Sequence, residues 1–245
     1  MKVCWNITSK CNKTCKYCFK FDREDLSLED NKKILNTLIN RKVERIAWTG
    51  GEPFLYKDLK ELLKISKENN ILNHVNTNAT LLNEDNLKES IENIDRLIIS
   101  LDFIDDKLNE EFGIGKDYFK HVSSLLGKIK EVNPKIEIRI NTVVFKNNLN
   151  LLEDLYNELL KYNIDYWKLI RFFPIRGKAI EENGLGVSDD EFIEIRERFE
   201  NRKQHFEIVL NGETELKERH IIVLSSGRLV YSEGGEDIET DDKLI

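Results

Sequence analysis

Short apolar runs rich in β-branched and aromatic residues alternate six times with helical patterns along this chain. The runs have strand length, and most segments between them repeat apolar residues with the 3.6-residue period of a helix. Regular alternation of strand and helix indicates parallel pairing with right-handed crossovers. The expected strands are 3–8, 45–49, 74–77, 96–102, 137–144 and 166–173. The predicted fold class is therefore α/β, either an open doubly wound sheet or a barrel-like sheet.

The C-terminal segment follows a different pattern. The runs at 206–210 and 219–232 predict strands, and Ser-Ser-Gly at 225–227 predicts a hairpin turn between two of them. The acidic tail that follows, GGEDIETDDKLI, is expected to be mobile. We therefore divide the chain into an α/β core over 1–205 and a strand and hairpin extension with an acidic tail over 206–245.

Composition narrows the classes of function. Hydrophobic residues make up 40% and charged residues 34% of the 245 residues, which is typical of a globular protein. The net charge of −7 opposes binding to a nucleic-acid polymer. No apolar run approaches the roughly 18 residues of a membrane span, and MKVCWNITSK lacks the apolar core of a signal peptide. We therefore expect no membrane partner and a cytoplasmic protein, in which clustered cysteines bind metal or act in catalysis rather than form disulfides.

Three of the four cysteines stand in one short stretch, CNKTCKYC, as Cys11, Cys15 and Cys18. The connection from Thr8 to Ser27 is much longer than the usual 2–6 residues between strand and helix. It leaves the carboxyl end of a strand, where α/β proteins build their sites. Three thiolates are one ligand short of a tetrahedral zinc site or a cubane cluster.

Four interpretations of these thiols are open. They are unliganded structural cysteines, a zinc site completed by a histidine, a four-cysteine electron-transfer cluster that includes Cys4, or a [4Fe–4S] cluster with one open iron. Cys4 lies within the first expected strand, away from the loop. None of the histidines stands at zinc-finger spacing; they are His74, His121, His205 and His220.

The spacing C-x3-C-x2-C, with the aromatic Tyr17 before the last cysteine, resembles the radical S-adenosylmethionine (SAM) superfamily. The sequence TGGEP, Thr49 to Pro53, supports the resemblance because it ends the next expected strand. The resemblance implies a partial (β/α)6 barrel with a short C-terminal β-hairpin extension. It also implies a [4Fe–4S] cluster that cleaves SAM to a 5′-deoxyadenosyl radical, which abstracts a substrate hydrogen.

The same resemblance implies roles for particular residues. Cys11, Cys15 and Cys18 would hold the cluster, Gly50, Gly51 and Glu52 would face the SAM amino group, and Tyr17 would border the adenine. By fold-level analogy, polar residues at later strand ends would meet SAM or the substrate: Asn76, Asn78, Ser100, Asp102 and Asn141. The alternative is that these are ordinary turn formers and helix caps.

Basic residues near strand ends suggest an anionic, phosphorylated ligand in an otherwise acidic protein. The stretch KLIRFFPIRGK carries four cations and no acid, and two more candidates lie on the fifth strand and after the fourth. The candidates are Lys116, Arg139, Lys168, Arg171, Arg176 and Lys178. The alternatives are an internal ion pair of Arg139 with Glu137 or another acid, and a solvated loop neutralised by Glu181 and Glu182.

Within the superfamily the chain resembles viperin-like enzymes, which dehydrate nucleoside triphosphates. The likeness rests on V-x-W-x-I-T before the cysteines, GGEPF, INTVV, Trp167 with Lys168, and SDDEF at 188–192. It departs in NTNAT after the third strand and in FGIGKDYF, which lacks an expected arginine. The resemblance implies a small-molecule substrate, such as a nucleoside triphosphate, and an electron donor such as flavodoxin or ferredoxin.

Two other functions stay open. One is a radical SAM enzyme that acts on a peptide, a protein or another small molecule, as maturases and glycyl-radical activases do. The other is a non-catalytic metal-binding protein. The absence of cysteine after Cys18 argues against an auxiliary cluster, so a single cluster is expected.

Overall fold

A single mixed sheet forms the centre of the molecule in the computed structural model, which describes residues 1–19, 24–173, 184–212, 220–233 and 236–243. Its ten described strands follow the order β10-β9-β8-β1-β2-β3-β4-β5-β6-β7. The strands are β1 Lys2–Thr8, β2 Arg45–Gly50, β3 Leu72–Thr77, β4 Arg96–Ser100, β5 Glu137–Val144, β6 Tyr166–Arg171, β7 Glu207–Asn211, β8 His220–Val223, β9 Arg228–Glu233 and β10 Glu236–Lys243.

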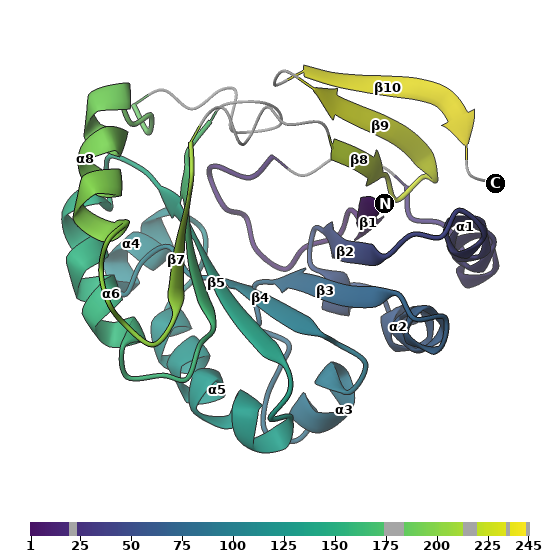
Figure 1. The fold of residues 1–245 in the computed structure, drawn as a ribbon, viewed down its shortest axis with the longest axis horizontal. Coiled ribbons are helices and arrows are strands. Elements are labelled where there is room, and N and C mark those ends of the chain that lie inside the picture. Colours follow the sequence, from purple (N-terminus) through teal and green to yellow (C-terminus); the bar gives the residue numbers. More distant parts are fainter. Residues whose placement is uncertain (20–23, 174–183, 213–219, 234–235, 244–245) are drawn as a thin grey trace.

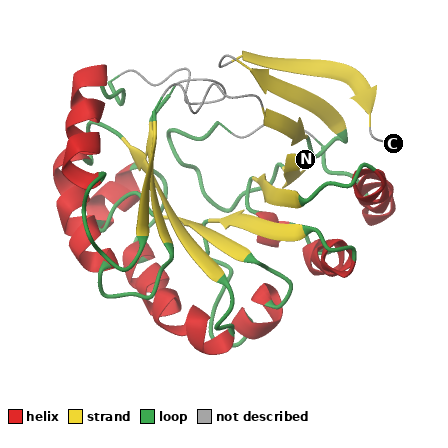
Figure 2. Ribbon diagram, in the orientation of Figure 1, coloured by secondary structure: helices red, strands yellow, loops and turns green. Residues whose placement is uncertain are grey.

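Strands β1 to β7 neighbour one another in chain order, and every pairing among them is parallel. The helices form an arc around the outside of this curved sheet (Figures 1 and 2). They are α1 Leu28–Asn40, α2 Leu59–Glu68, α3 Leu87–Ile91, α4 Asp106–Glu111, α5 Tyr118–Val132, α6 Leu152–Leu159 and α8 Asp189–Phe199. The expected α/β partial barrel is confirmed.

Alternation along the strands separates a helix-covered face from an inner face. In β5, Ile138 and Ile140 are buried, whereas Arg139 and Asn141, which alternate with them, are only partly buried. The core forms where the apolar faces of strands and helices meet. There, for example, the Trp5 and Trp48 rings stack with centroids 5.0 Å apart. The polar inner face is therefore the concave side of the sheet, which we call the lumen.

Local sequence signals explain where the helices begin. Ser27 caps α1 by accepting a hydrogen bond from the backbone N–H of Asp30, and Ser188 with Glu191 forms a capping box that begins α8. The short helix α4, capped by Asp105, was not predicted because it has too few turns to show a period. None of the described helices is long and apolar enough to cross a membrane.

The region after residue 205 divides between the two edges of the sheet. Strand β7 extends the parallel sheet beside β6, whereas β8 pairs in parallel with β1, and β9 and β10 follow antiparallel. The hairpin turn is confirmed, since the N–H of Gly227 donates to Leu224 O at 2.9 Å. The expectation of a mobile acidic tail is wrong: residues 236–243 form β10, because β9 offers unpaired backbone groups and edge strands accommodate charged side chains.

Candidate active site

The loop between β1 and α1 carries the three clustered cysteines across the space enclosed by the arc of helices, where Figure 1 shows it in purple. Its backbone is tied to the segment after α4. The N–H of Thr14 donates to Gly113 O at 3.2 Å, and the N–H of Lys16 donates to Phe112 O at 3.1 Å. A Cβ on Gly113 would stand 2.4 Å from Thr14 O, so only glycine permits this approach.

The TGGEP turn holds the start of the same loop. The N–H of Gly51 donates to Thr8 O at 2.7 Å, and the N–H of Glu52 donates to Lys10 O at 2.8 Å. A Cβ would come within 2.1 Å of Thr8 O if added to Gly50, and within 2.0 Å of Lys10 O if added to Gly51. The two glycines are therefore required by a close approach of the chain to itself. Their predicted contact with SAM stays a prediction.

The carboxylate of Glu52 is fully buried and joins the ends of β2 and β3. It accepts hydrogen bonds from Thr77 Oγ1 at 2.7 Å, from the N–H of Asn78 at 2.7 Å and from the N–H of Phe54 at 3.2 Å. Burial raises the pKa of Glu52, although these three donors act against the rise. The side chain thus fixes the turn that lies against the cysteine loop.

Asp102 ties the cysteine loop to the ends of β4 and β5. Its carboxylate accepts a hydrogen bond from the Tyr17 hydroxyl and one from the N–H of Val143 at 2.6 Å. Burial raises the pKa of Asp102 to about 6, and the two hydrogen bonds limit the rise. The Tyr17 ring packs against Phe145, with centroids 4.5 Å apart. Asp102 and Tyr17 therefore position the loop, whatever further contact either makes.

The thiols are suited to hold a metal cluster. Burial first, then the charges of Asp102, Cys18 and Cys11, raise the pKa of Cys15 to about 12. Such a thiol becomes a thiolate only with a strong positive partner, and bound iron supplies that charge. Cys4 instead lies in β1 beside an apolar cluster with Ile222, so it stands apart from the cysteine loop.

The geometry offers no support for the zinc interpretation. Among the described residues, no three His, Cys, Asp or Glu side chains, the loop cysteines included, are grouped around a point where a single metal ion could bind. No described histidine therefore completes a single-ion site with these thiols. His121 and His205 each place Nε2 within hydrogen-bonding distance of a backbone carbonyl, at 3.0 Å and 2.8 Å. His74 lies in a different cavity, which is described below. The side chain of His220 falls outside the described part of the chain.

Several predicted residues meet in the lumen. Ser100 pairs in register with Asn141, and Asn141 with Lys168, so the three lie side by side on β4, β5 and β6. Ser100 is exposed, and the side-chain oxygen of Asn141 is buried without a hydrogen-bond donor. Buried acceptors in proteins are usually hydrogen-bonded, and no described residue donates to this one. A bound molecule could supply the missing donor.

Arg139 lies one inward position below Asn141 on β5. Its expected alternative, an internal ion pair with Glu137, is wrong because Glu137 pairs with Arg96, whose Nε donates at 2.6 Å. The Nε of Arg139 is buried without a partner. Burial first, then Arg96 and Arg45, lower the pKa of Arg139 to about 10, so the group remains charged at neutral pH.

The remaining predicted residues have varied surroundings. Asn78 donates to Asn12 Oδ1 at 2.9 Å and lies 3.9 Å from Cys11 Sγ, whereas Asn76 faces Trp48 O at 3.5 Å. Lys116 is exposed beyond α4.

Arg171 has protein partners of its own. It donates to Val187 O at 2.6 Å and pairs with Asp189, so its charge is already matched. Arg176 and Lys178 lie outside the described residues, as do Glu181 and Glu182.

Asp25 is a loop-positioning residue that sequence reasoning missed. Its carboxylate accepts hydrogen bonds from Thr8 Oγ1 at 2.6 Å and from the N–H of Ser9 at 2.8 Å. The end of the loop is held in turn by the hairpin, since the N–H of Leu26 donates to Ser225 O at 3.1 Å. No local motif could have indicated these contacts, because they join distant parts of the chain.

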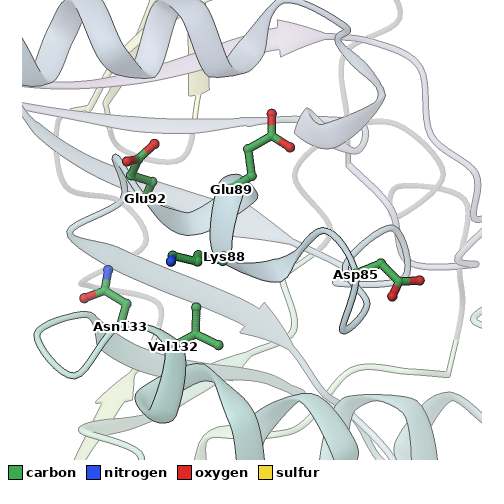
Figure 3. Close-up of a pocket in the computed structure, with 6 residues that line it drawn as sticks. All are labelled: Asp85, Lys88, Glu89, Glu92, Val132 and Asn133. Carbon is green, nitrogen blue, oxygen red and sulfur yellow. The ribbon is translucent and has the colours of Figure 1, made fainter.

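Another cavity, of about 560 Å³, lies elsewhere, beside α3 and the end of α5. Figure 3 shows that the carboxylates of Asp85, Glu89 and Glu92 stand apart from one another there, and Glu89 pairs with Lys60 at 2.9 Å. The cavity shares no residue with the lumen, and its charges do not converge on a ligand.

A parallel partial barrel whose first loop presents three thiols beside a glycine-glycine-glutamate turn defines a radical SAM enzyme. The family model of the radical SAM superfamily matches residues 5–169, and the chain belongs to this superfamily. Its cofactors are a [4Fe–4S] cluster and SAM.

Several relatives of the chain are named S-adenosylmethionine-dependent nucleotide dehydratases. An S-adenosylmethionine-dependent nucleotide dehydratase of Selenomonas ruminantium is 31% identical, over 96% of this chain and 87% of the relative. Another, from Fibrobacter sp. (strain UWH6), is 33% identical, over 77% of this chain and 58% of the relative. Among solved structures, Streptococcus suis SuiB bound to S-adenosylmethionine superposes with a TM-score of 0.76 at 20% identity, covering 93% of this chain and 59% of SuiB. That likeness concerns the fold alone.

Proposed function

We propose that this enzyme is a SAM-dependent nucleotide dehydratase whose substrate is a nucleoside triphosphate. The proposal rests on two buried polar atoms in the lumen that have no hydrogen-bond partner among the described residues. They are the Nε of Arg139 and, one inward position above it, the side-chain oxygen of Asn141. The names of the relatives agree with this substrate class.

In this proposal Cys11, Cys15 and Cys18 hold the cluster, and the turn at Gly50 to Glu52 contacts SAM. When bound, the cluster and SAM supply a 5′-deoxyadenosyl radical that abstracts a substrate hydrogen. The protein orients the substrate hydrogen toward that position and excludes water from the lumen. An external flavodoxin or ferredoxin is the proposed electron donor.

The phosphates are assigned to the polar inner face of β5 and β6. A guanidinium binds phosphate oxygens bidentately, and charged hydrogen bonds of this kind are the strong ones in proteins. Lys168, which pairs in register with Asn141, adds a second cation on the same face. Lys116 is a further candidate at the exposed rim. We leave Arg171 out of the phosphate site because Asp189 already matches its charge.

Anaerobic reconstitution tests the proposal. We expect about four irons per chain and formation of 5′-deoxyadenosine that a nucleoside triphosphate stimulates. Cys11→Ala should abolish cluster binding and SAM cleavage, whereas Cys4→Ala, which removes the cysteine outside the loop, should preserve both. A panel of four ribonucleoside triphosphates is compared with peptides under the same conditions. Stimulation by peptides alone would favour a maturase, and stoichiometric zinc without SAM cleavage would favour a metal-binding scaffold.

A further inference from the structure

A cavity of about 380 Å³ lies at the amino ends of the inner strands, at the opposite end of the sheet from the cysteine loop. We call it the amino-end cavity. Basic side chains dominate its wall: Lys2, Arg45, His74, Arg96 and Lys135. Lys2, Arg45 and Arg96 are the first residues of β1, β2 and β4. Because these strands are parallel, their amino ends, and so these three residues, lie at the same end of the sheet.

The acidic residues that border the cavity already have partners. Glu137 is paired with Arg96, and Asp95 with Lys67. Glu44 lies 3.0 Å from the amino-terminal ammonium group. None of these carboxylates is left to neutralise the other cations of the wall.

Three cations therefore lack a matching acid. The side chains of Lys2, Arg45 and Lys135 form no ion pair or hydrogen bond with the part of the chain that the structure describes. Lys2 and Lys135 are exposed, so water can solvate them. The Nε of Arg45 is buried and has no partner, which solvation does not explain.

The cations also act on one another. Burial first, then the charge of Arg96, lower the pKa of Arg45. Burial and the charges of Arg96, Arg45, Arg139 and Lys2 lower the pKa of His74 to about 3, so this histidine is neutral. The amino-end cavity is thus a concave region of uncompensated positive potential, which an anion would neutralise.

We propose that the amino-end cavity binds the phosphate group of a small molecule. A phosphate carries up to two negative charges near neutral pH and matches several unpaired cations better than a single carboxylate does. The volume suits a small ligand rather than a polymer. The amino-end cavity lies at the far end of the same inner face from Asn141 and Lys168, and Arg139 lies close enough to act on His74. Phosphate binding there does not require that the substrate be a nucleotide.

Isothermal titration calorimetry of the reconstituted, SAM-bound enzyme tests the site with inorganic phosphate, inorganic pyrophosphate and a nucleoside monophosphate at constant ionic strength. We expect Arg45→Gln to weaken pyrophosphate binding about tenfold, as loss of a charged hydrogen-bond donor does. Lys135→Gln, at an exposed position that leaves the fold intact, should weaken it less. The matched control, Arg41→Gln, removes an exposed arginine that does not line the cavity and should change nothing.

Lys168→Gln distinguishes phosphate binding in the amino-end cavity from phosphate binding beside Asn141, because Lys168 pairs in register with Asn141 on the neighbouring strand. The proposal predicts a binding event that survives Lys168→Gln and is weakened by Arg45→Gln. The proposal would be overturned if Lys168→Gln abolished all binding while Arg45→Gln left binding unchanged. It would also be overturned if the unaltered enzyme bound none of the three compounds. Tighter binding of the nucleoside monophosphate than of phosphate would identify a nucleotide as the source of the phosphate group, and equal affinity would identify free phosphate. Nucleotide-stimulated SAM cleavage, measured separately, reports on the proposed function alone.

Discussion

The surroundings of Arg139 favour a role in binding over a role in stabilising the fold. Its Nε is buried without a partner, although Glu137 stands two positions away on the same strand. A structural arginine would have taken that carboxylate, because an unpaired buried charge lowers stability. The proposed function assigns Arg139 to the phosphates because no described residue partners its Nε.

Arg139→Gln should raise the KM for the nucleotide by about tenfold or more, because one charged hydrogen-bonding group is lost. The melting temperature should not fall, since the substitution removes a buried charge that has no partner. Steady-state kinetics and thermal denaturation measure the two quantities. Iron content should equal that of the unaltered enzyme, and a clear loss of thermal stability would show that Arg139 is structural.

Gly51→Ala should destabilise the fold by about 3 kcal/mol or prevent folding, because the new Cβ would overlap a backbone carbonyl that cannot move freely. The distance from that Cβ to Lys10 O would be 2.0 Å. Gly127→Ala is the matched control: Gly127 lies in α5, and nothing stands within 4 Å of its added Cβ. The control should gain about 0.5–1 kcal/mol in urea unfolding. Equal stabilities of the two variants would contradict the close approach.

His74 should make the protein less stable at acidic pH. Its folded pKa is about 3, whereas the unfolded value is about 6.5. The unfolded chain therefore binds more protons between these values, and the free energy of unfolding falls as the pH drops below about 6.5. In phosphate-free buffer, His74→Gln should lose less stability between pH 7 and pH 5 than the unaltered protein, by about 1 kcal/mol after solvent screening. Parallel pH profiles would show that Arg45, Arg96, Arg139 and Lys2 do not act on His74 as described.

At the scale of elements, three separate sets of contacts hold the cysteine loop. The TGGEP turn holds its start, the backbone at Phe112 and Gly113 holds its middle, and Asp25 joins its start to its end. Because the described residues of the loop form no helix or strand, these contacts determine where the thiols stand. A long loop held at several points is typical of a site rather than a linker.

Asp25→Ala should lower the iron bound per chain and destabilise the fold by about 1–3 kcal/mol, because Thr8 and Ser9 lose a buried acceptor. Asp85→Asn is the control variant, which should keep its iron and its stability. Asp85 is exposed and lines the cavity beside α3, away from the cysteine loop (Figure 3). Iron analysis after reconstitution and urea unfolding measure both effects. Full iron content in Asp25→Ala would mean that the TGGEP turn and the backbone at Phe112 and Gly113 hold the loop without Asp25.

Elements with a strong period could be predicted from the sequence, and weakly patterned ones could not. Strands β1 to β6 were expected within a few residues because their apolar runs are long enough to show. Strand β10 was missed because its residues are mostly acidic, and its pairing depends on the open edge of β9 rather than on its own composition. The same limit applies to α4, which has six residues.

At the scale of the whole molecule, residue types at strand ends predicted the region of the site but not the partner of each side chain. The register brings Ser100, Asn141 and Lys168 together, and period-two alternation sufficed to predict a polar lumen. No pattern indicated that Asp189 would take the charge of Arg171, because that pairing depends on how α8 packs. The glycines of TGGEP were recognised for the motif, whereas their contact with the loop backbone became visible only in three dimensions.

The pairing of β1 with β8 has a consequence for the order of synthesis. The cysteines are translated well before the strand beside β1 and the hairpin carbonyl that accepts from Leu26, which lie about 200 residues later in the chain. A nascent chain that has not yet reached Ser225 therefore has its thiols on a loop with one anchor missing. We expect stable cluster insertion to follow synthesis of the hairpin, so that chains stalled before Ser225 do not retain iron.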